Sequence, residues 1–105
     1  MTTTVTETVG TIEYIQNVCN RNGAVLHVVD ASQNADISAV IYDIAKGIRS
    51  ADHHVILLDN FNRISRSVQE TIANILDTRF VQYSYGNKRF GCRLPVNTEI
   101  IAIAS

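Results

Sequence analysis

The sequence predicts a small α/β domain built on a parallel sheet of about three strands, and three observations lead to this fold class. The run 55–58, Val-Ile-Leu-Leu, is bounded by polar residues, which is typical of a strand buried on both faces. Two further short runs rich in β-branched residues, 24–30 and 99–104, indicate its neighbours in the sheet. Before and between these runs, apolar residues recur at helical spacing. The expected order is helix, strand, helix, strand, helix, hairpin, strand, with helices flanking the sheet in three layers.

The composition fits one globular domain. With 105 residues, 46% of them hydrophobic and 18% charged, the chain has enough apolar residues for a modest core. A formal net charge of −1 gives no general attraction to nucleic acid or anionic membranes, so such a partner would need a local patch. Cys19 and Cys92 do not suggest a disulfide framework, and neither a signal peptide nor an apolar run of ~20 residues is seen. We therefore expect a cytoplasmic protein with no membrane contact.

Residues 1–10 are Thr-rich and are interpreted as a flexible tail or as an extended arm that adds a strand to a sheet edge. The rest of the chain, 11–105, is predicted to be a single domain. Its first helix spans 11–22, with Thr11 as the N-cap and Gly23 as the stop.

A right-handed β-α-β unit is expected over 24–59. Its first strand ends in Asp30, and its second strand, a parallel neighbour, ends in Asp59. The helix between them begins after a cap at Asp36 or Asn34. Its core face consists of apolar residues at helical spacing, which are Ile37, Val40, Ile41, Ile44 and Ile48.

The next helix is capped by Ser65 or, in a second register, by a capping box of Ser67 and Glu70. The segment that follows, 80–93, alternates loosely and predicts a β-hairpin with its turn at Gly86-Asn87. The buried stripe of the helix consists of Val68, Ile72, Ile75 and Leu76.

Asp59 is the first candidate functional residue, because it stands at the carboxyl end of the central strand. Ligands and metal ions of open α/β sheets collect at this edge, where a carboxylate can hold a cation or orient a water. The alternative is that Asp59 only caps the turn that follows. The residues after Asp59 bear on this choice.

Residues 55–63, continued by 64–70 and 75–79, resemble the Walker B segment and the following helix of AAA+ ATPases, most closely the MoxR-like branch. The family pattern is a hydrophobic strand, Asp-Glu, a short Asn-Arg turn, a helix, a hairpin and a strand that ends in a polar sensor residue. Residues 94–105 are similar to that last strand, so the resemblance covers 24–105. It implies a P-loop-NTPase-like fold whose functional positions are Walker B (Asp59, Asn60), the turn after it (Asn62, Arg63) and a residue like sensor 1 (Ser105).

The chain departs from this family at the residues that bind and hydrolyse ATP. Asn60 stands where the family has the Glu that polarises water, and an amide cannot act as a base. A Walker A motif, Gly-x-x-x-x-Gly-Lys-Ser/Thr, is absent, since Lys46 follows Ala45 and Lys88 precedes Arg89. The strand that carries the P-loop in the middle of the family's sheet is therefore expected to be missing, with the first helix in its place. The Walker B and sensor residues should then form a vestigial, hydrogen-bonded cluster without ATP, magnesium or catalytic residues.

The histidines are interpreted as surface or core residues and not as metal ligands. His53 and His54 are adjacent in a strand, so their side chains point to opposite faces and cannot both bind one metal in the usual way. His27 lies within another strand. No spacing places either cysteine next to a histidine, so neither a metal site nor a Cys-His nucleophile is predicted.

The hairpin segment 79–93 is the second candidate site, because it carries four cations and no acid, interleaved with aromatic residues. Such a hairpin can hold a nucleic-acid backbone and stack bases, and in the resembled family a hairpin here often faces the pore of the ring. The favoured alternative is that the aromatics pack on the domain while the charge stays exposed. The candidate binding residues are Arg79, Tyr83, Tyr85, Lys88, Arg89 and Arg93.

These observations lead to a non-catalytic interaction module that binds a protein partner, either an AAA+ ATPase or a second copy, at an exposed edge of its small sheet. Two alternatives stay open. One is a fragment or split half of an active MoxR-like ATPase whose P-loop lies elsewhere, and the other is a nucleic-acid-binding module that uses the hairpin 79–93. A receiver-like domain phosphorylated at Asp59 fits less well, because the acids and lysine expected around such an aspartate have no clear counterparts.

Overall fold

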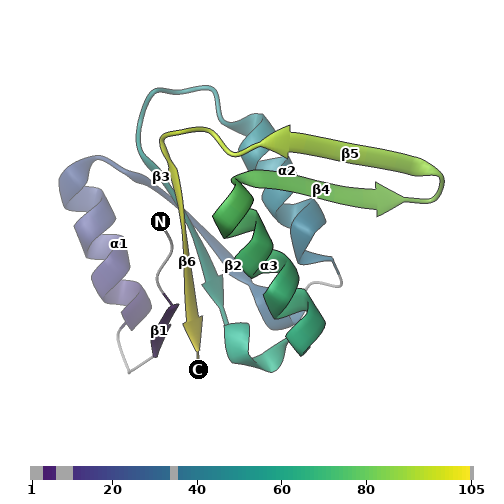
Figure 1. Cartoon of the computed structure of the whole chain (residues 1–105). Helices are drawn as coiled ribbons and strands as arrows, with labels where there is room; N and C mark the ends of the chain where they lie inside the picture. The colour runs from purple at the N-terminus through teal and green to yellow at the C-terminus, as the bar shows by residue number, and fades with distance from the viewer. Residues whose placement is uncertain (1–3, 7–10, 34–35, 105) are drawn as a thin grey trace.

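The structure is a computed structural model that describes residues 4–6, 11–33 and 36–104, and for residues 4–6 and Thr11 it describes the backbone only. Strands, α-helices and two short 3₁₀ turns, η1 and η2, alternate along these residues (Figure 1). In chain order they are β1 (Thr4–Thr6), α1 (Thr11–Asn22), β2 (Val25–Asp30), η1 (Ala31–Gln33), α2 (Ile37–Gly47), β3 (His54–Asp59), η2 (Phe61–Arg63), α3 (Arg66–Thr78), β4 (Phe80–Tyr85), β5 (Lys88–Arg93) and β6 (Thr98–Ala104).

Four strands form one parallel sheet in the order β1-β6-β3-β2, and β4 and β5 form a separate antiparallel hairpin (Figure 1). The three predicted sheet strands and the hairpin are thus confirmed, with β3 between β2 and β6. The expectation of about three strands, with a helix in place of a first strand, is wrong, because the parallel strand β1 precedes α1 and pairs with the end of β6 from Ala102 to Ala104. A run of three residues is too short to show a period of two, so the sequence left this segment open between a tail and an edge strand.

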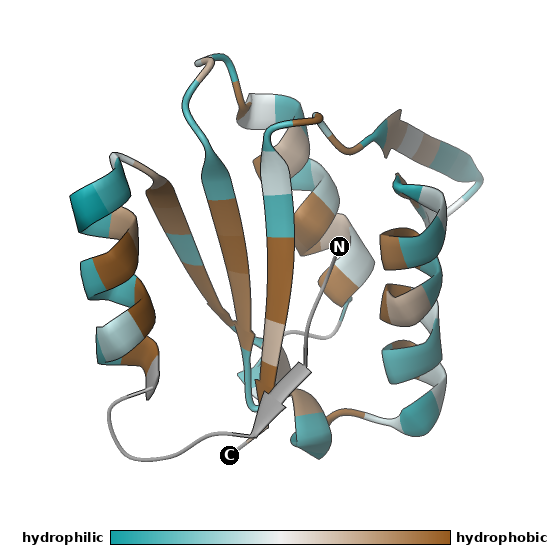
Figure 2. Ribbon diagram, turned by 60° about the vertical axis from the view of Figure 1, so that its left-hand side comes forward, coloured by the Kyte–Doolittle hydropathy of each residue, from teal (hydrophilic) through white to brown (hydrophobic). Residues whose placement is uncertain are grey.

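The sheet carries α1 on one face and α2 and α3 on the other, as Figures 1 and 2 show. The chain crosses from β1 to β2 along the α1 face and returns through β3 to β6 along the opposite face. The connections from β2 to β3 and from β3 to β6 reverse both the direction and the face of the first connection, so all three crossovers have the same hand. Because all four strands are parallel, their carboxyl ends meet at one edge of the sheet and their amino ends at the other.

The N-terminal boundaries of α2 and α3 follow the predicted caps, whereas α1 already includes Thr11, the residue predicted as its N-cap. Of the two candidates for α2, Asp36 is the N-cap, and it accepts a hydrogen bond from the Ala39 N–H at 3.2 Å. Ser65 caps α3 by accepting from the Val68 N–H at 3.3 Å, so the first of the two predicted registers is the correct one. Helix α3 ends at Thr78, and its C-cap Arg79 has a left-handed conformation (φ 61°) that turns the chain into β4.

The main core lies between the sheet and the layer of α2 and α3. Strand β3 is buried from His54 to Leu58, and the apolar run predicted this burial for 55–58. Ile56 and Leu58 belong to the core under α2 and α3, where Ile41 and Ile72 are also fully buried. The alternate residues of β3 face α1 on the other side of the sheet. No helix in the described part of the chain is both long and apolar enough to span a bilayer.

Candidate functional site

The predicted site at the carboxyl edge of the sheet is built by the ends of β2 and β3. Asp30 and Asp59 are the last residues of these strands and are partners in the pairing register, so both side chains reach the same edge. Asn60 follows in the left-handed conformation (φ 59°), which turns the chain out of the sheet. Asn adopts this conformation more readily than most residues with a side chain. The local sequence Asp-Asn therefore suits both the strand end and the sharp turn.

Protein hydrogen bonds close this edge. The side-chain amide of Asn60 donates to Asp30 Oδ1 at 2.9 Å, and the Asn60 backbone N–H donates to Asp59 Oδ1 at 2.9 Å. The N–H and hydroxyl of Ser32 donate to the same oxygen of Asp30, at 3.0 and 2.7 Å. The hydrogen bonds from Asn60 and then Ser32 hold the pKa of Asp30 below its ordinary value, with a smaller contribution from Arg63. Asp30 is therefore a carboxylate at neutral pH, and Asn60 bridges it to Asp59.

The structure brings only part of the predicted set to this edge. Asn62 and Arg63 lie in η2, directly after Asn60, and both are exposed. Arg63 is close enough to Asp30 for its charge to act on that carboxyl group. Ser105 lies outside the described residues, so its place beside Asp59 stays a prediction.

Sequence reasoning missed two members of the cluster. Asp30 was expected at the end of a strand, but only the register of β2 against β3 shows that it pairs with Asp59. No sequence motif pointed to Ser32, because it joins the cluster only through its hydrogen bonds to Asp30. Among the described residues, no group of three or more His, Cys, Asp and Glu side chains is arranged to hold a metal ion.

The hairpin rests on α2 through one of its faces. Tyr83 and Phe90 stack with ring centres 5.0 Å apart, and both rings meet Tyr42 of α2, at 5.3 and 6.1 Å. Val81 on the same face is fully buried. The prediction that the hairpin aromatics pack on the domain is therefore confirmed for Tyr83 and Phe90. Tyr85 instead stands at the turn, 79% exposed.

The opposite face of the hairpin is open to solvent and positively charged. Arg89 and Arg93 alternate with the half-buried residues of β5, Phe90 and Cys92, and so lie on this outer face, while Lys88 lies at the tip. All three are exposed. The ring of Phe80 also lies here against Gly91, where an added Cβ would come within 3.0 Å of it. The outer face thus combines cations with one partly exposed aromatic ring.

Arg79 does not belong to this charged face. Its Nη2 donates to the carbonyl oxygens of Pro95 at 2.8 Å and Thr98 at 2.9 Å, and the residue is half-buried. The left-handed turn at Arg79 directs the side chain toward the start of β6 instead of along the hairpin. The expectation that the hairpin's positive charge is exposed is therefore wrong for Arg79 and correct for the other three cations.

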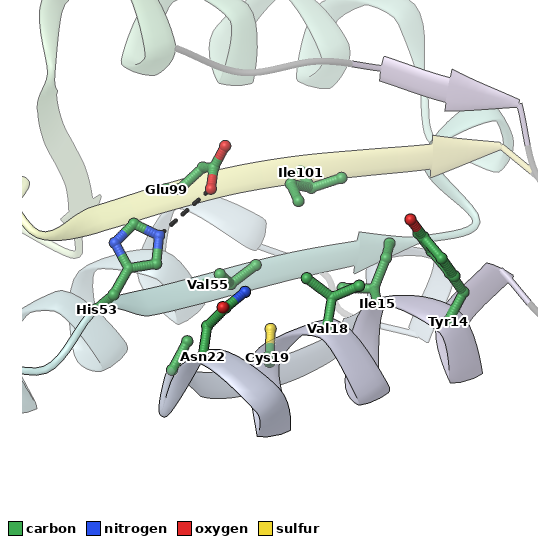
Figure 3. Close-up of a pocket in the computed structure, with 10 residues that line it drawn as sticks. Tyr14, Ile15, Val18, Cys19, Asn22, His53, Val55, Glu99 and Ile101 are labelled. Atoms are coloured by element: carbon green, nitrogen blue, oxygen red, sulfur yellow. Dashed lines mark hydrogen bonds and ion pairs between the residues drawn. The ribbon is translucent and has the colours of Figure 1, made fainter.

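A groove of about 330 Å³ lies between α1 and the sheet (Figure 3). The side chains of His53 and Glu99, 3.4 Å apart, lie at one end of it, and Tyr14 lies at the other. Burial, and then the charge of Glu99, raise the pKa of the Cys19 thiol on the groove wall, so this cysteine stays protonated and is a poor nucleophile. The rest of the lining is mainly apolar and includes Ile15, Val18, Val55 and Ile101.

Comparison with known proteins assigns no family to this arrangement. No protein-family model matches the chain, and no curated protein matches it. The function therefore has to be argued from the geometry of the edge, the hairpin and the sheet.

Proposed function

We propose that this chain is a non-catalytic interaction module with an AAA+-like core, which binds a protein partner. The observation that carries the non-catalytic part is the hydrogen bond from Asn60 to Asp30. In the resembled family a Glu at this position polarises the attacking water, whereas the amide nitrogen of Asn only donates and cannot take a proton. A Glu at position 60 would also place a third carboxylate beside Asp30 and Asp59, where like charges repel.

The place of β1 supports the same proposal. In AAA+ ATPases the P-loop connects a strand in the middle of the sheet to the helix that follows it. In this chain β1 lies beside β6 and is followed by α1, and the connecting residues 7–10 are Glu-Thr-Val-Gly, with an acid and no lysine. Phosphate binding needs backbone amides together with a cation. This favours a degenerate nucleotide site over the split ATPase, whose P-loop strand would have to come from elsewhere.

We propose the edge strand β2 as the surface for the partner. It pairs with β3 on one side, and no strand of the described residues lies along its other side. Val25 and Val28 are 37% and 51% exposed. An open apolar edge strand is a template for pairing with another chain. A second copy suits this edge, because antiparallel pairing of β2 with itself sets apolar residues together and keeps the two Asp30 carboxylates at opposite ends.

Titration calorimetry with ATP and magnesium is expected to give no binding heat, because the lysine and the glycine-rich loop that hold phosphates are absent. An Asn60→Glu variant should bind no better, since the phosphate contacts would still be missing. Micromolar binding that disappears in Asp59→Ala would reveal a working nucleotide site, and the non-catalytic proposal would then be wrong.

Size-exclusion chromatography with light scattering is expected to find a dimer that Val28→Lys converts to a monomer, because a lysine on each edge opposes strand pairing. The matched control replaces Lys88, Arg89 and Arg93 together with Ser and should leave the dimer intact. Substitutions at exposed positions usually change the free energy of unfolding by no more than ~0.5 kcal/mol each, so both variants should melt near the wild-type temperature.

Two outcomes would contradict the proposed edge. A monomeric wild-type chain at high protein concentration would exclude the second copy as the partner. Binding of single-stranded nucleic acid that weakens steeply with salt and is lost in the hairpin variant would favour the nucleic-acid alternative, since each phosphate contact releases counterions.

A further inference from the structure

Three polar side chains form a hydrogen-bonded chain at the amino edge of the sheet, opposite the carboxylate cluster. Ser50 lies in the loop between α2 and β3, and its Oγ is 3.0 Å from Nε2 of His54. Nδ1 of His54 is 3.1 Å from Nε2 of His27 on the neighbouring strand β2. His27 pairs in register with Ile56, two residues after His54, so both imidazoles lie on the same face of the sheet.

The two imidazoles form a hydrogen bond and not a metal site. Their planes differ by 18° and their centres are 5.4 Å apart. A ring nitrogen lies about 1.15 Å from the centre of its imidazole, so two nitrogens 3.1 Å apart can belong to rings 5.4 Å apart only if both lie near the line that joins the ring centres. Nδ1 of His54 and Nε2 of His27 therefore point at each other. One nitrogen then donates its proton and the other accepts it. A zinc ion on that line would need the nitrogens about 4 Å apart, at about 2.0–2.1 Å from each.

These hydrogen bonds arrange Ser50, His54 and His27 as a serine nucleophile, its base and a residue that orients the base. Burial, and then the charge of His54, lower the pKa of His27, so His27 is neutral and able to accept at neutral pH. When His54 donates from Nδ1 to His27, its Nε2 carries the lone pair that faces the Ser50 hydroxyl. A hydroxyl, an imidazole base and a third group that orients the base are the elements of nucleophilic catalysis by serine.

The surroundings leave the hydroxyl accessible and the base protected. Ser50 is exposed, whereas His54 is 6% exposed. Asn97 fixes the loop by donating from Nδ2 to the carbonyl oxygens of Ser50 at 3.2 Å and Asp52 at 2.6 Å. Among the described residues, the backbone N–H groups of 49–53 donate none of the backbone hydrogen bonds found in turns, loops and caps.

Two basic residues next to Ser50 and His54 in the sequence, Arg49 and His53, have partners outside this set of hydrogen bonds. Arg49 donates to the carbonyl oxygen of Lys46 at 2.7 Å, at the end of α2. His53 points to the other face of the sheet, where it meets Glu99.

We infer that Ser50 is a base-activated nucleophile that accepts an acyl group from small activated esters. Its Oγ attacks the carbonyl carbon while its proton passes to Nε2 of His54, and the bond from that carbon to the leaving oxygen then breaks. His54 returns the proton to the leaving oxygen, so the products are an ester on Ser50 and a free alcohol or phenol. His27 acts as a positioning residue that fixes the tautomer of His54. This inference does not depend on the proposed partner or on the carboxylate cluster.

The experiment treats the whole chain with p-nitrophenyl acetate and measures the release of p-nitrophenolate over time. Peptide mass mapping then identifies which serine carries the acetyl group. We expect acetylation of Ser50 about 100-fold faster than that of the exposed Ser84, which is the lower range for a positioned base. Ser50→Ala should abolish the fast phase, and His54→Asn should reduce it to the rate of Ser84. The rate should fall in acid, below the lowered pKa of His27, where His27 is protonated and can no longer accept from His54.

His27→Gln separates positioning from structure, because Gln can still accept a hydrogen bond but changes the pH profile of Ser50 acetylation. His53→Asn is the matched control and should leave both the rate and its pH profile unchanged. Circular dichroism checks that each variant is folded. The inference is overturned if Ser50 reacts no faster than Ser84 in the wild-type chain, or if its rate does not depend on pH. If His54→Asn unfolds the chain, the wild-type comparison with Ser84 and the pH profile still decide.

Discussion

Replacing Leu57 with Asp is expected to leave the chain without a cooperative thermal unfolding transition. Leu57 is fully buried in the central strand β3, where its register partners are Val28 of β2 and Ile101 of β6. The change removes a buried leucine and places an unpaired carboxylate there, at a cost of several kcal/mol. Domains of this size have a total stability at the lower end of about 5–15 kcal/mol. Far-UV circular dichroism during heating measures the result.

Val96→Asp is the matched control for this experiment, because Val96 is 99% exposed and a carboxylate there stays in water. It should melt within a few degrees of the wild-type chain. If Leu57→Asp also melts cooperatively near the wild-type temperature, then β3 is not the centre of the core.

The sequence was most informative where burial and local capping act together. The run from Val55 to Leu58 predicted β3 because a strand buried on both faces needs apolar residues at every position. The caps at Asp36 and Ser65 were readable because the side chain bonds a backbone N–H three residues away. The short strand β1 was left open, because three residues gain their pairing from β6 and not from their own pattern.

The candidate site was predictable only where it is local in sequence. Asp59 and Asn60 were found because they directly follow the buried run. Their partner Asp30 is 29 residues away from Asp59 along the chain, and only the sheet register brings the two together. The contact between His27 and His54 spans 27 residues and depends on the same register. Neither contact can be derived from composition or spacing alone.

Arg79 shows how a single backbone angle can redirect a side chain. Its position next to the hairpin suggested an exposed binding residue, since nothing in the sequence marks a left-handed turn at an arginine. Its φ of 61° instead carries the guanidinium to the loop before β6. The Leu94 N–H also donates to the Arg79 carbonyl oxygen at 2.8 Å, so the residue joins the end of α3, the hairpin and β6.

Arg79→Ala is therefore expected to lower the free energy of unfolding by about 2–4 kcal/mol, because two hydrogen bonds from a charged group are lost and two carbonyl oxygens lose their donor. Arg79→Gly loses the same bonds but relieves the left-handed backbone, so it should be more stable than the Ala variant by about 1 kcal/mol. Arg79→Lys keeps the charge but cannot reproduce the planar guanidinium, and we expect it between the wild type and the Gly variant. Urea denaturation at a constant m-value gives the order directly.

Arg93→Ala is the control, since Arg93 is an exposed cation on the same hairpin and opposes Phe80 across the strands. It should change the stability by no more than ~0.5 kcal/mol. Equal effects of Arg79→Ala and Arg93→Ala would mean that the bonds to Pro95 and Thr98 do not hold the hairpin to the sheet, and Arg79 would return to the charged surface as a binding residue. A large effect of Arg79→Ala alone would assign this residue to the fold and leave Lys88, Arg89 and Arg93 as the hairpin cations that can contact a partner.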